Sequence, residues 1–286
     1  MILALILCLG ASAQDLRSPL YINLDLSKPD SGAHVVSYQP AFAQDEKGVL
    51  TFVWTAYRDG KERILSSSIR GAQPSVDRML SPGEGVYYQP TIVSTGLESA
   101  WTFWMRLEAG RWQVVGRQRM NGEWTPMRAL SSVAVNALRP AALAAGKRVF
   151  LAWEQDDGKL HRIAFRIWNG ETWSAPSLLS AAEGPAYRPA LAAAADGDIW
   201  AFWDSYRHGE YAIFGRKIHP ALGQIEQISS GPESCLKPVA VYGSKAGVVV
   251  AWLARTDVTG AAGVIDQWFT LQAAFNPSTS PFLRSG

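Results

Sequence analysis

A repeat of about fifty residues runs through most of this chain and restricts its fold more than any other feature. Five copies each carry a polar residue followed by proline and, 13 or 14 residues after that proline, a tryptophan. The dipeptides are Gln39-Pro40, Gln89-Pro90, Arg139-Pro140, Arg188-Pro189 and Lys237-Pro238, and the tryptophans are Trp54, Trp104, Trp153, Trp203 and Trp252. A fixed period of this kind indicates one structural unit per copy.

Each copy has the apolar pattern of short strands. Two apolar runs lie between the proline and the tryptophan, and a turn and a third, alternating segment follow. In the first four copies a glycine lies in that turn, and a fourth segment ends in an apolar residue and serine. No copy contains a stretch with helical apolar spacing. Four strands per copy predict an all-β fold, a β-propeller with blades near 37–85, 86–135, 136–185, 186–233 and 234–276. We expect the tryptophans to pack between neighbouring blades and the prolines to begin strands.

The fifth copy contains only three clear strands, and residues 20–27 match the missing fourth. We therefore expect one domain over residues 14–286, a five-bladed ring closed by this N-terminal strand. Residues 280–285 offer an alternative fourth strand, in which case the chain is the front part of a six- or seven-bladed propeller. Closure is favoured because an open ring exposes strand edges.

Residues 1–13 resemble a cleaved signal peptide, with an apolar run followed by small residues. The expected location is secreted or periplasmic, and the mature chain, with no further segment long enough to span a membrane, is expected to be a monomer. Its single cysteine, Cys235, excludes an intrachain disulfide. A net charge of +2 without charge runs gives no indication of nucleic acid binding, and the four histidines lack metal-site spacing. We expect no metal and no cofactor.

Two sets of polar residues are predicted to meet on one face of the propeller. The residues before the prolines surround the channel mouth, and segments after the tryptophans form loops, of which residues 253–263 are the longest. Amide and cationic side chains suit a carbohydrate or another acidic or polar ligand. The candidate ligand-binding residues are Gln39, Gln89, Arg139, Arg188, Lys237, Arg58, Arg207, Arg255 and Asp257. In the alternative interpretation, the cations form framework ion pairs with Glu154, Asp156, Asp157 and Asp204.

The segments NGEWTPMRALS and WNGETWSAPSLLS resemble the Asp-box of sialidase-like propellers, with Gly122, Trp124, Gly170, Thr172 and Trp173 in matching places and the box serine and aspartate absent. Leu-Arg-Pro at 138–140 and Tyr-Arg-Pro at 187–189 resemble the sialidase Arg-Ile-Pro motif. The resemblance implies a propeller in which the box is structural.

By that resemblance, a sialidase-like enzyme would need a tyrosine nucleophile, an activating glutamate and an acid. The weak candidates are Tyr57 or Tyr206, Glu154 and Asp204, none of them in a matching motif. The sequence therefore favours an exported, non-catalytic propeller that binds a carbohydrate or other polar ligand. A sialidase-like or five-bladed glycoside hydrolase, a protein-interaction scaffold and an accessory module of a longer enzyme are the alternatives.

Overall fold

The computed structural model describes residues 36–58, 60–70, 73–75, 78–243, 247–259 and 265–275. In this part of the chain the regular elements are strands, arranged in five antiparallel sheets. The prediction of an all-β propeller with four-stranded blades is confirmed. None of the described residues belongs to a helix long and apolar enough to cross a membrane.

Each sheet is a meander that runs from an inner strand outward. The first contains β1 (Val36–Gln44), β2 (Leu50–Arg58), β3 (Lys61–Arg70), β4 (Gln73–Pro74) and β5 (Arg78–Met79). The second contains β6 (Val86–Gly96), β7 (Ser99–Glu108), β8 (Arg111–Met120), β9 (Glu123–Trp124) and β10 (Arg128–Ala129). The third contains β11 (Asn136–Ala145), β12 (Arg148–Asp156), β13 (His161–Trp168) and β14 (Ser177–Leu178). The fourth contains β15 (Ala186–Ala193), β16 (Ile199–Arg207), β17 (Glu210–His219) and β18 (Glu226–Gln227). The fifth contains β19 (Ser234–Gly243), β20 (Gly247–Thr259) and β21 (Ile265–Phe275).

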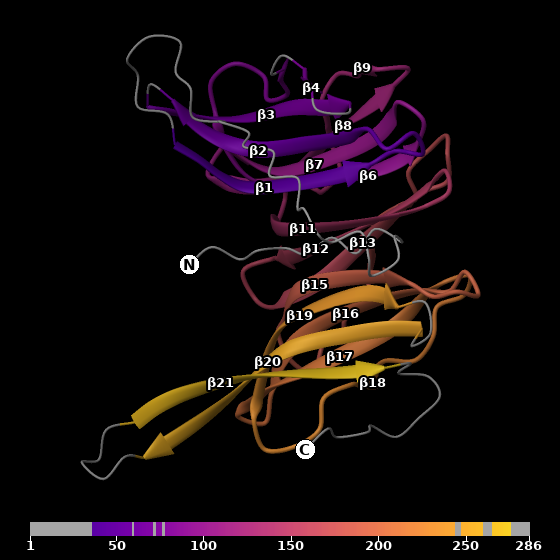
Figure 1. Ribbon diagram of the computed structural model, residues 1–286. Coiled ribbons are helices and arrows are strands. Elements are labelled where there is room, and N and C mark those ends of the chain that lie inside the picture. Colours follow the sequence, from indigo (N-terminus) through magenta and orange to yellow (C-terminus); the bar gives the residue numbers. More distant parts are fainter. Residues whose placement is uncertain are drawn as a thin grey trace.

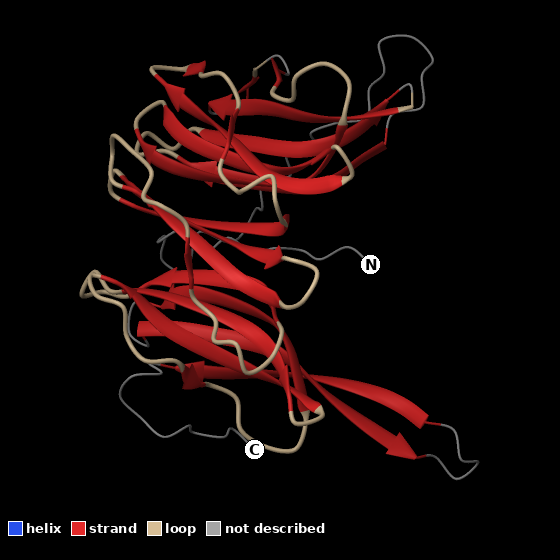
Figure 2. Ribbon diagram, turned by 180° about the vertical axis from the view of Figure 1, so that it is seen from behind, coloured by secondary structure: helices blue, strands red, loops and turns tan. Residues whose placement is uncertain are grey.

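The inner strands β1, β6, β11, β15 and β19 are neighbours in that order, so the sheets follow one another around an axis. Figures 1 and 2 show this fan from opposite sides, and in Figure 1 it runs from the indigo first sheet to the yellow fifth sheet. The segments predicted to be a signal peptide (1–13) and closing strands (20–27 or 280–285) lie outside the described residues.

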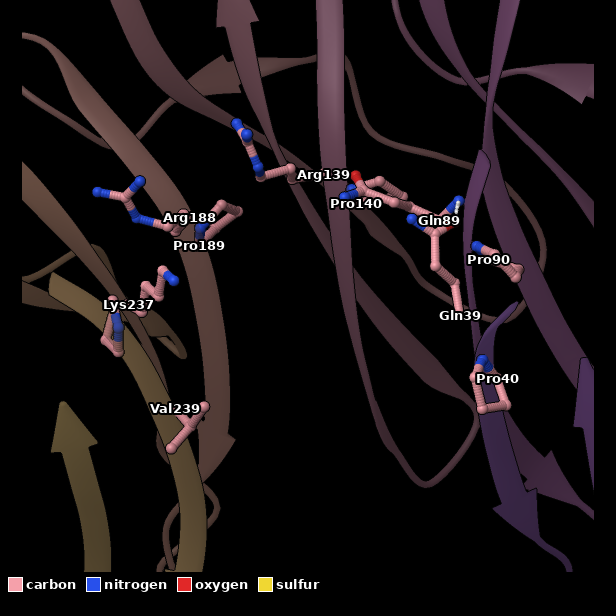
Figure 3. A pocket seen from close by; sticks show the side chains of 11 residues that line it. Gln39, Pro40, Gln89, Pro90, Arg139, Pro140, Arg188, Pro189, Lys237 and Val239 are labelled. Carbon is pink, nitrogen blue, oxygen red and sulfur yellow. Dashed lines mark hydrogen bonds between the residues drawn. The ribbon is translucent and has the colours of Figure 1, made fainter. Parts of the chain in front are cut away.

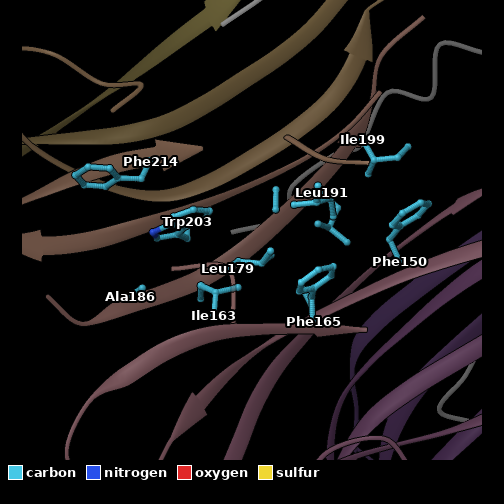
Figure 4. Packing of buried hydrophobic residues seen from close by; sticks show 12 residues of the cluster. Phe150, Ile163, Phe165, Leu179, Ala186, Leu191, Ile199, Trp203 and Phe214 are labelled. Carbon is cyan, nitrogen blue, oxygen red and sulfur yellow. The ribbon is translucent and has the colours of Figure 1, made fainter. Parts of the chain in front are cut away.

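Four of the five repeated tryptophans pack between sheets, as predicted. Trp203 is fully buried in one cluster with Phe150 and Ile163 of the third sheet (Figure 4). Trp104, Trp153 and Trp252 each share a cluster with residues of the sheet before their own. Replacing so large a buried side chain by alanine typically costs about 3–5 kcal/mol, so these contacts are the main apolar links between blades.

The recurring serine at the end of each of the first four copies is also part of the framework. Its hydroxyl oxygen accepts a hydrogen bond from a buried backbone N–H of the third strand. The four pairs are Ser81 with Ile64, Ser131 with Val114, Ser180 with Ile163, and Ser229 with Ile213, at 2.9–3.1 Å.

The prediction that each repeated proline begins a strand is wrong. The inner strands begin three or four residues earlier, and every proline lies at a β-bulge within its strand. The residue before each proline has a left-handed φ of 50–56°. The bulge leaves these two residues out of the ladder pairing, so the missing proline N–H breaks no hydrogen bond between strands.

The residues after the tryptophans were expected in loops, and the structure places most of them in strands. Glu154 lies within β12 and Asp204 within β16. In the fifth sheet, Leu253 to Thr259 continue β20 and pair with β21 as far as Thr259 opposite Ile265. As far as Thr259, the predicted long loop is therefore strand, and these ends of β20 and β21 project beyond the rest of the sheet in Figures 1 and 2.

Trp173, from the segment that resembles an Asp-box, has a packing role. Its ring meets Trp101 and Phe103 of the second sheet edge-on, at centroid distances of 5.2 and 5.8 Å. The preceding turn is held by Asn169, whose side-chain oxygen accepts hydrogen bonds from the N–H groups of Glu171 and Thr172. This segment thus joins two blades, in line with the structural role that the resemblance implies.

Candidate functional site

A cavity of about 370 Å³ lies at the axis, and the five residue–proline dipeptides line it together with Val239. Figure 3 shows these side chains facing one space from the five inner strands. We call Gln39, Gln89, Arg139, Arg188 and Lys237 the mouth residues and this space the central cavity. The structure thus brings together the five residues that the sequence placed at the channel mouth.

The mouth residues are tied to the preceding sheet through their backbone. In four of them the N–H donates to a side chain of that sheet. The pairs are Gln89 with Gln39 Oε1 at 2.9 Å, Arg139 with Met105 Sδ at 3.3 Å, Arg188 with Glu154 Oε1 at 2.6 Å, and Lys237 with Asp204 Oδ2 at 2.8 Å. Because the bulge removes these N–H groups from the ladder, each needs such an acceptor.

Three of these four acceptors come from one repeated position. Met105, Glu154 and Asp204 each follow the repeated tryptophan of their sheet, and in the first sheet Thr55 occupies that place. Thr55 Oγ1 donates to Gln39 Oε1 at 3.4 Å, so the glutamine side chain itself reaches the next sheet. We call Thr55, Met105, Glu154 and Asp204 the clamp residues.

In the fourth sheet the clamp is a buried ion pair. Arg188 donates from Nε and Nη2 to the two carboxylate oxygens of Asp204, at 2.6 and 2.8 Å. The Asp204 side chain has no exposed surface. Burial raises the pKa of this carboxyl, while the Arg188 guanidinium and the Lys237 N–H oppose that rise.

The third sheet contains the corresponding ion pair between Arg139 and Glu154, joined by a single hydrogen bond. Arg139 Nη1 donates to Glu154 Oε2 at 2.7 Å, and the Glu154 side chain is again fully buried. Of the partners considered from the sequence, Glu154 and Asp204 hold the arginines, whereas Asp156 and Asp157 accept hydrogen bonds from their own turn. Two of the three mouth cations are therefore neutralised, whereas Lys237 is exposed and has no carboxylate partner among the described residues.

The second sheet departs from this pattern and opens a side pocket of about 210 Å³. Its walls are Tyr88, Met105 and Leu138, and its rim is formed by Gln39, Gln89 and Arg139, which it shares with the central cavity. Gln89 Oε1 is buried there with no hydrogen-bond partner in the described structure. The side pocket is thus a polar-rimmed recess beside the channel mouth.

Two groups of aromatic rings accompany the inner strands. Tyr88 lies between Tyr38 and Trp112, with ring centroids 6.1 and 5.5 Å away. Tyr187 takes the same position in the fourth sheet, between His161 and Tyr211 at 4.9 and 6.3 Å. The sequence carries a signal for these rings, since tyrosine precedes the mouth residue in three repeats, but their mutual contacts are not visible in it.

Tyr88 also donates a hydrogen bond to Glu62 Oε1. This is a tyrosine–glutamate contact beside the side pocket, and sequence reasoning missed it. The hydrogen bond to Glu62 raises the pKa of the Tyr88 phenol, so the phenol stays protonated at neutral pH.

Of the other predicted residues, Tyr57, Tyr206, Arg207 and Arg255 are not among the residues that line the two cavities. Tyr57 and Tyr206 are exposed, at 41% and 43%, but line neither space. Arg207 packs over the Phe214 ring at 4.1 Å, and Arg255 lies in β20 opposite Phe269. Arg58 ends β2 and Asp257 lies in β20, with side chains outside the described part.

Glu154 and Asp204, the predicted activator and acid, are fully buried and bonded to the framework. No group of three or more histidine, cysteine, aspartate or glutamate side chains among the described residues is arranged to hold a metal ion. Cys235 is buried and unpaired, and burial raises the pKa of its thiol.

No protein-family model matches this chain, and no curated protein does. Solved structures do resemble it. A Dyadobacter fermentans protein of unknown function is 11% identical with a TM-score of 0.60, over 87% of this chain and 83% of its own. Penicillium chrysogenum α-L-arabinanase, complexed with arabinobiose, is 12% identical with a TM-score of 0.56, over 76% and 77%.

A Hadza microbial sialidase is 11% identical with a TM-score of 0.54. The match covers 87% of this chain and 59% of the sialidase, so this chain spans about three fifths of that protein. At such identities the likeness shows the fold alone, that of a β-propeller.

Proposed function

We propose that this protein binds a carbohydrate at the channel mouth without hydrolysing it. The observation that carries the proposal is the lining of the two cavities. Amides, guanidinium groups, an ammonium group and an aromatic ring line them, but no carboxylate among the described residues does. Hydrolysis of a glycosidic bond usually needs two carboxyl groups facing the sugar, whereas binding needs only hydrogen-bond donors, acceptors and apolar surface.

The similar structures supply the first probes. The Penicillium arabinanase is complexed with arabinobiose, and another similar protein is a sialidase. Arabinobiose, arabinan, sialyllactose and an array of neutral and acidic glycans therefore form the first binding screen, followed by titration calorimetry on the best ligand.

Two variants test the place of binding without touching the framework. Val239→Trp fills the central cavity from a side chain that is 64% exposed, and Lys237→Ala removes the mouth cation that has no carboxylate partner in the described structure. Lys147→Ala, in the exposed turn between β11 and β12, is the matched control. We expect Val239→Trp to weaken binding about tenfold or more, through steric exclusion. Unchanged binding by a folded Val239→Trp protein would refute the proposed site.

A glycoside hydrolase is the second candidate, because Tyr88 donates to Glu62 beside the side pocket. The raised pKa of Tyr88 argues against an efficient nucleophile. Fluorogenic arabinosides and sialosides test this candidate directly. Turnover that is lost in Tyr88→Phe would establish catalysis and overturn the non-catalytic proposal.

We also propose that residues 1–13 direct export and that the mature protein, a single domain from Gln14, acts as a monomer outside the cytoplasm. N-terminal sequencing after expression in a secreting host tests the cleavage, and light scattering tests the monomer. An N-terminus that retains Met1 would contradict the first expectation.

A further inference from the structure

The side pocket differs in chemistry from the corresponding places in the next two sheets. Met105 stands where Glu154 and Asp204 stand, and Gln89 stands where Arg139 and Arg188 stand. In the third and fourth sheets the two positions bond to each other through an ion pair. In the second sheet they do not, and the side pocket lies there.

This substitution leaves polar groups available to a ligand. The buried Gln89 Oε1 has no partner in the described structure, and only Nη1 of Arg139 bonds to Glu154. A buried acceptor without a donor is unfavourable because it has lost its hydrogen bonds to water, and a ligand hydroxyl can restore one by donating to it. The unpaired amide is thus an independent sign that something polar belongs in this pocket.

The apolar part of the pocket is equally defined. Tyr88 forms a wall and belongs to the row Tyr38, Tyr88 and Trp112, while Met105 and Leu138 complete the walls. A sugar ring presents C–H groups on its faces and hydroxyls at its edge, so it pairs an aromatic wall with an amide and guanidinium rim. The side pocket has a volume of about 210 Å³, which is on the scale of one monosaccharide.

Charge selects among sugars. The one ion on the rim, Arg139, is already paired with Glu154, and the remaining lining residues are neutral. A carboxylate in this pocket would lose hydration without gaining an unpaired cation, which is unfavourable.

We propose that the side pocket binds one ring of an uncharged sugar, so that the ligand is a neutral oligosaccharide that reaches from the central cavity into the side pocket. This inference rests on the proposed carbohydrate binding and deepens it. It names the neutral class of ligand and assigns the specificity to Tyr88, Gln89 and Met105.

The test fills the side pocket with the ion pair that the protein already has in the third and fourth sheets. The double variant Gln89→Arg with Met105→Glu introduces the residue pair of the third and fourth sheets, which occupies the pocket while leaving the central cavity open. We expect it to keep a wild-type unfolding transition and to lose about tenfold or more in affinity for the neutral glycans of the screen. Tyr88→Ala should lose a similar factor, whereas Tyr88→Phe, which keeps the ring, should lose less than about threefold.

Each outcome separates this inference from the proposed function. Binding that is lost in Val239→Trp but retained in the double variant overturns the side pocket and leaves the proposed function standing. If the protein instead prefers sialyllactose or polygalacturonate, and its affinity for them falls strongly between about 50 mM and about 500 mM NaCl, the proposal of a neutral ligand is wrong. If wild type binds no glycan, both fail together. Should the double variant not fold, Leu138→Phe narrows the same pocket from its opposite wall, and unchanged binding would contradict the inference.

Discussion

The junctions between neighbouring blades differ in the group that accepts a hydrogen bond from the backbone N–H of the mouth residue. In the third and fourth sheets, a buried carboxylate accepts the N–H of the next mouth residue and also holds the arginine of its own sheet. Between the second and third sheets, Met105 gives only a thioether acceptor, and a pocket of about 210 Å³ lies beside it. A single repeated position therefore provides either a strong clamp or a recess, and a repeat protein can build a site by weakening its framework at one junction.

The junction between the first two sheets lies between these extremes. Gln39 supplies the acceptor for Gln89 from its own mouth side chain, without any charge. Removing clamps of different kinds should thus reveal how much each contributes to stability.

The largest effect is expected for Asp204→Ala. This change leaves Arg188 and the Lys237 N–H without their acceptor in a buried place, which should lower the free energy of unfolding by about 3–5 kcal/mol. Urea unfolding monitored by tryptophan fluorescence measures it. Lys237→Ala keeps the backbone N–H bond and should stay within about 0.5 kcal/mol of wild type. A loss below about 1 kcal/mol in Asp204→Ala would show that the ionic clamp adds little.

A smaller loss is expected for Gln39→Leu. It removes the acceptor of the Gln89 N–H at similar side-chain volume, and one unsatisfied backbone group costs about 1–2 kcal/mol. Met105→Leu, which removes only a weak sulfur acceptor, is the comparison and should cost less than about 1 kcal/mol. Thermal unfolding of the two variants side by side decides the order. Equal losses would mean that acceptor strength does not distinguish these junctions.

The smallest effect concerns pH. Burial raises the pKa of Asp204 above its ordinary 3.8, so the folded state holds this proton more tightly than the unfolded state. The contribution of this group to stability therefore falls as pH rises from below 3.8 through the folded pKa. Asp204→Asn does not titrate, so the stability advantage of wild type over it should be greatest in acid. That advantage should decline with rising pH, at most by about 1.4 kcal/mol for each pH unit between the unfolded and folded pKa, and then level off. Chemical unfolding of both proteins at several pH values measures it, and an advantage that grows with pH would show that Arg188 outweighs burial.

Much of the fold can be predicted from the sequence because large apolar residues, above all tryptophan, recur at a constant place in each repeat. The spacing of Trp104, Trp153 and Trp203 predicted interfaces that the structure contains, since a tryptophan at a constant place in each copy has the same burial. The end of the second strand was missed because Glu154 and Asp204 read as loop residues. A charged residue continues a buried strand only when a partner neutralises it, and that partner, the mouth arginine, stands some 15 residues away in the chain.

The candidate site was predictable only in part. The channel mouth followed from the repeat. The side pocket depends on Met105, which stands at a repeated position that is polar in the first, third and fourth sheets. The sequence does not show that this position holds the next mouth residue, so the importance of the methionine could not be recognised from it. The contact between Tyr88 and Glu62 joins two sheets and has no local pattern.

The left-handed bulge at the mouth has a consequence for how such a protein acquires new ligands. Glycine would adopt this backbone most easily, yet all five positions carry long side chains. In four of them the unfavourable φ is held by a hydrogen bond from the mouth residue's N–H to a side chain of the preceding blade. The side chains of Gln39, Arg139 and Arg188 are themselves part of the framework contacts, whereas Gln89 and Lys237 are tied to the preceding blade through their backbone N–H. A library randomised at Gln89 and Lys237 would therefore vary specificity while the scaffold stays constant.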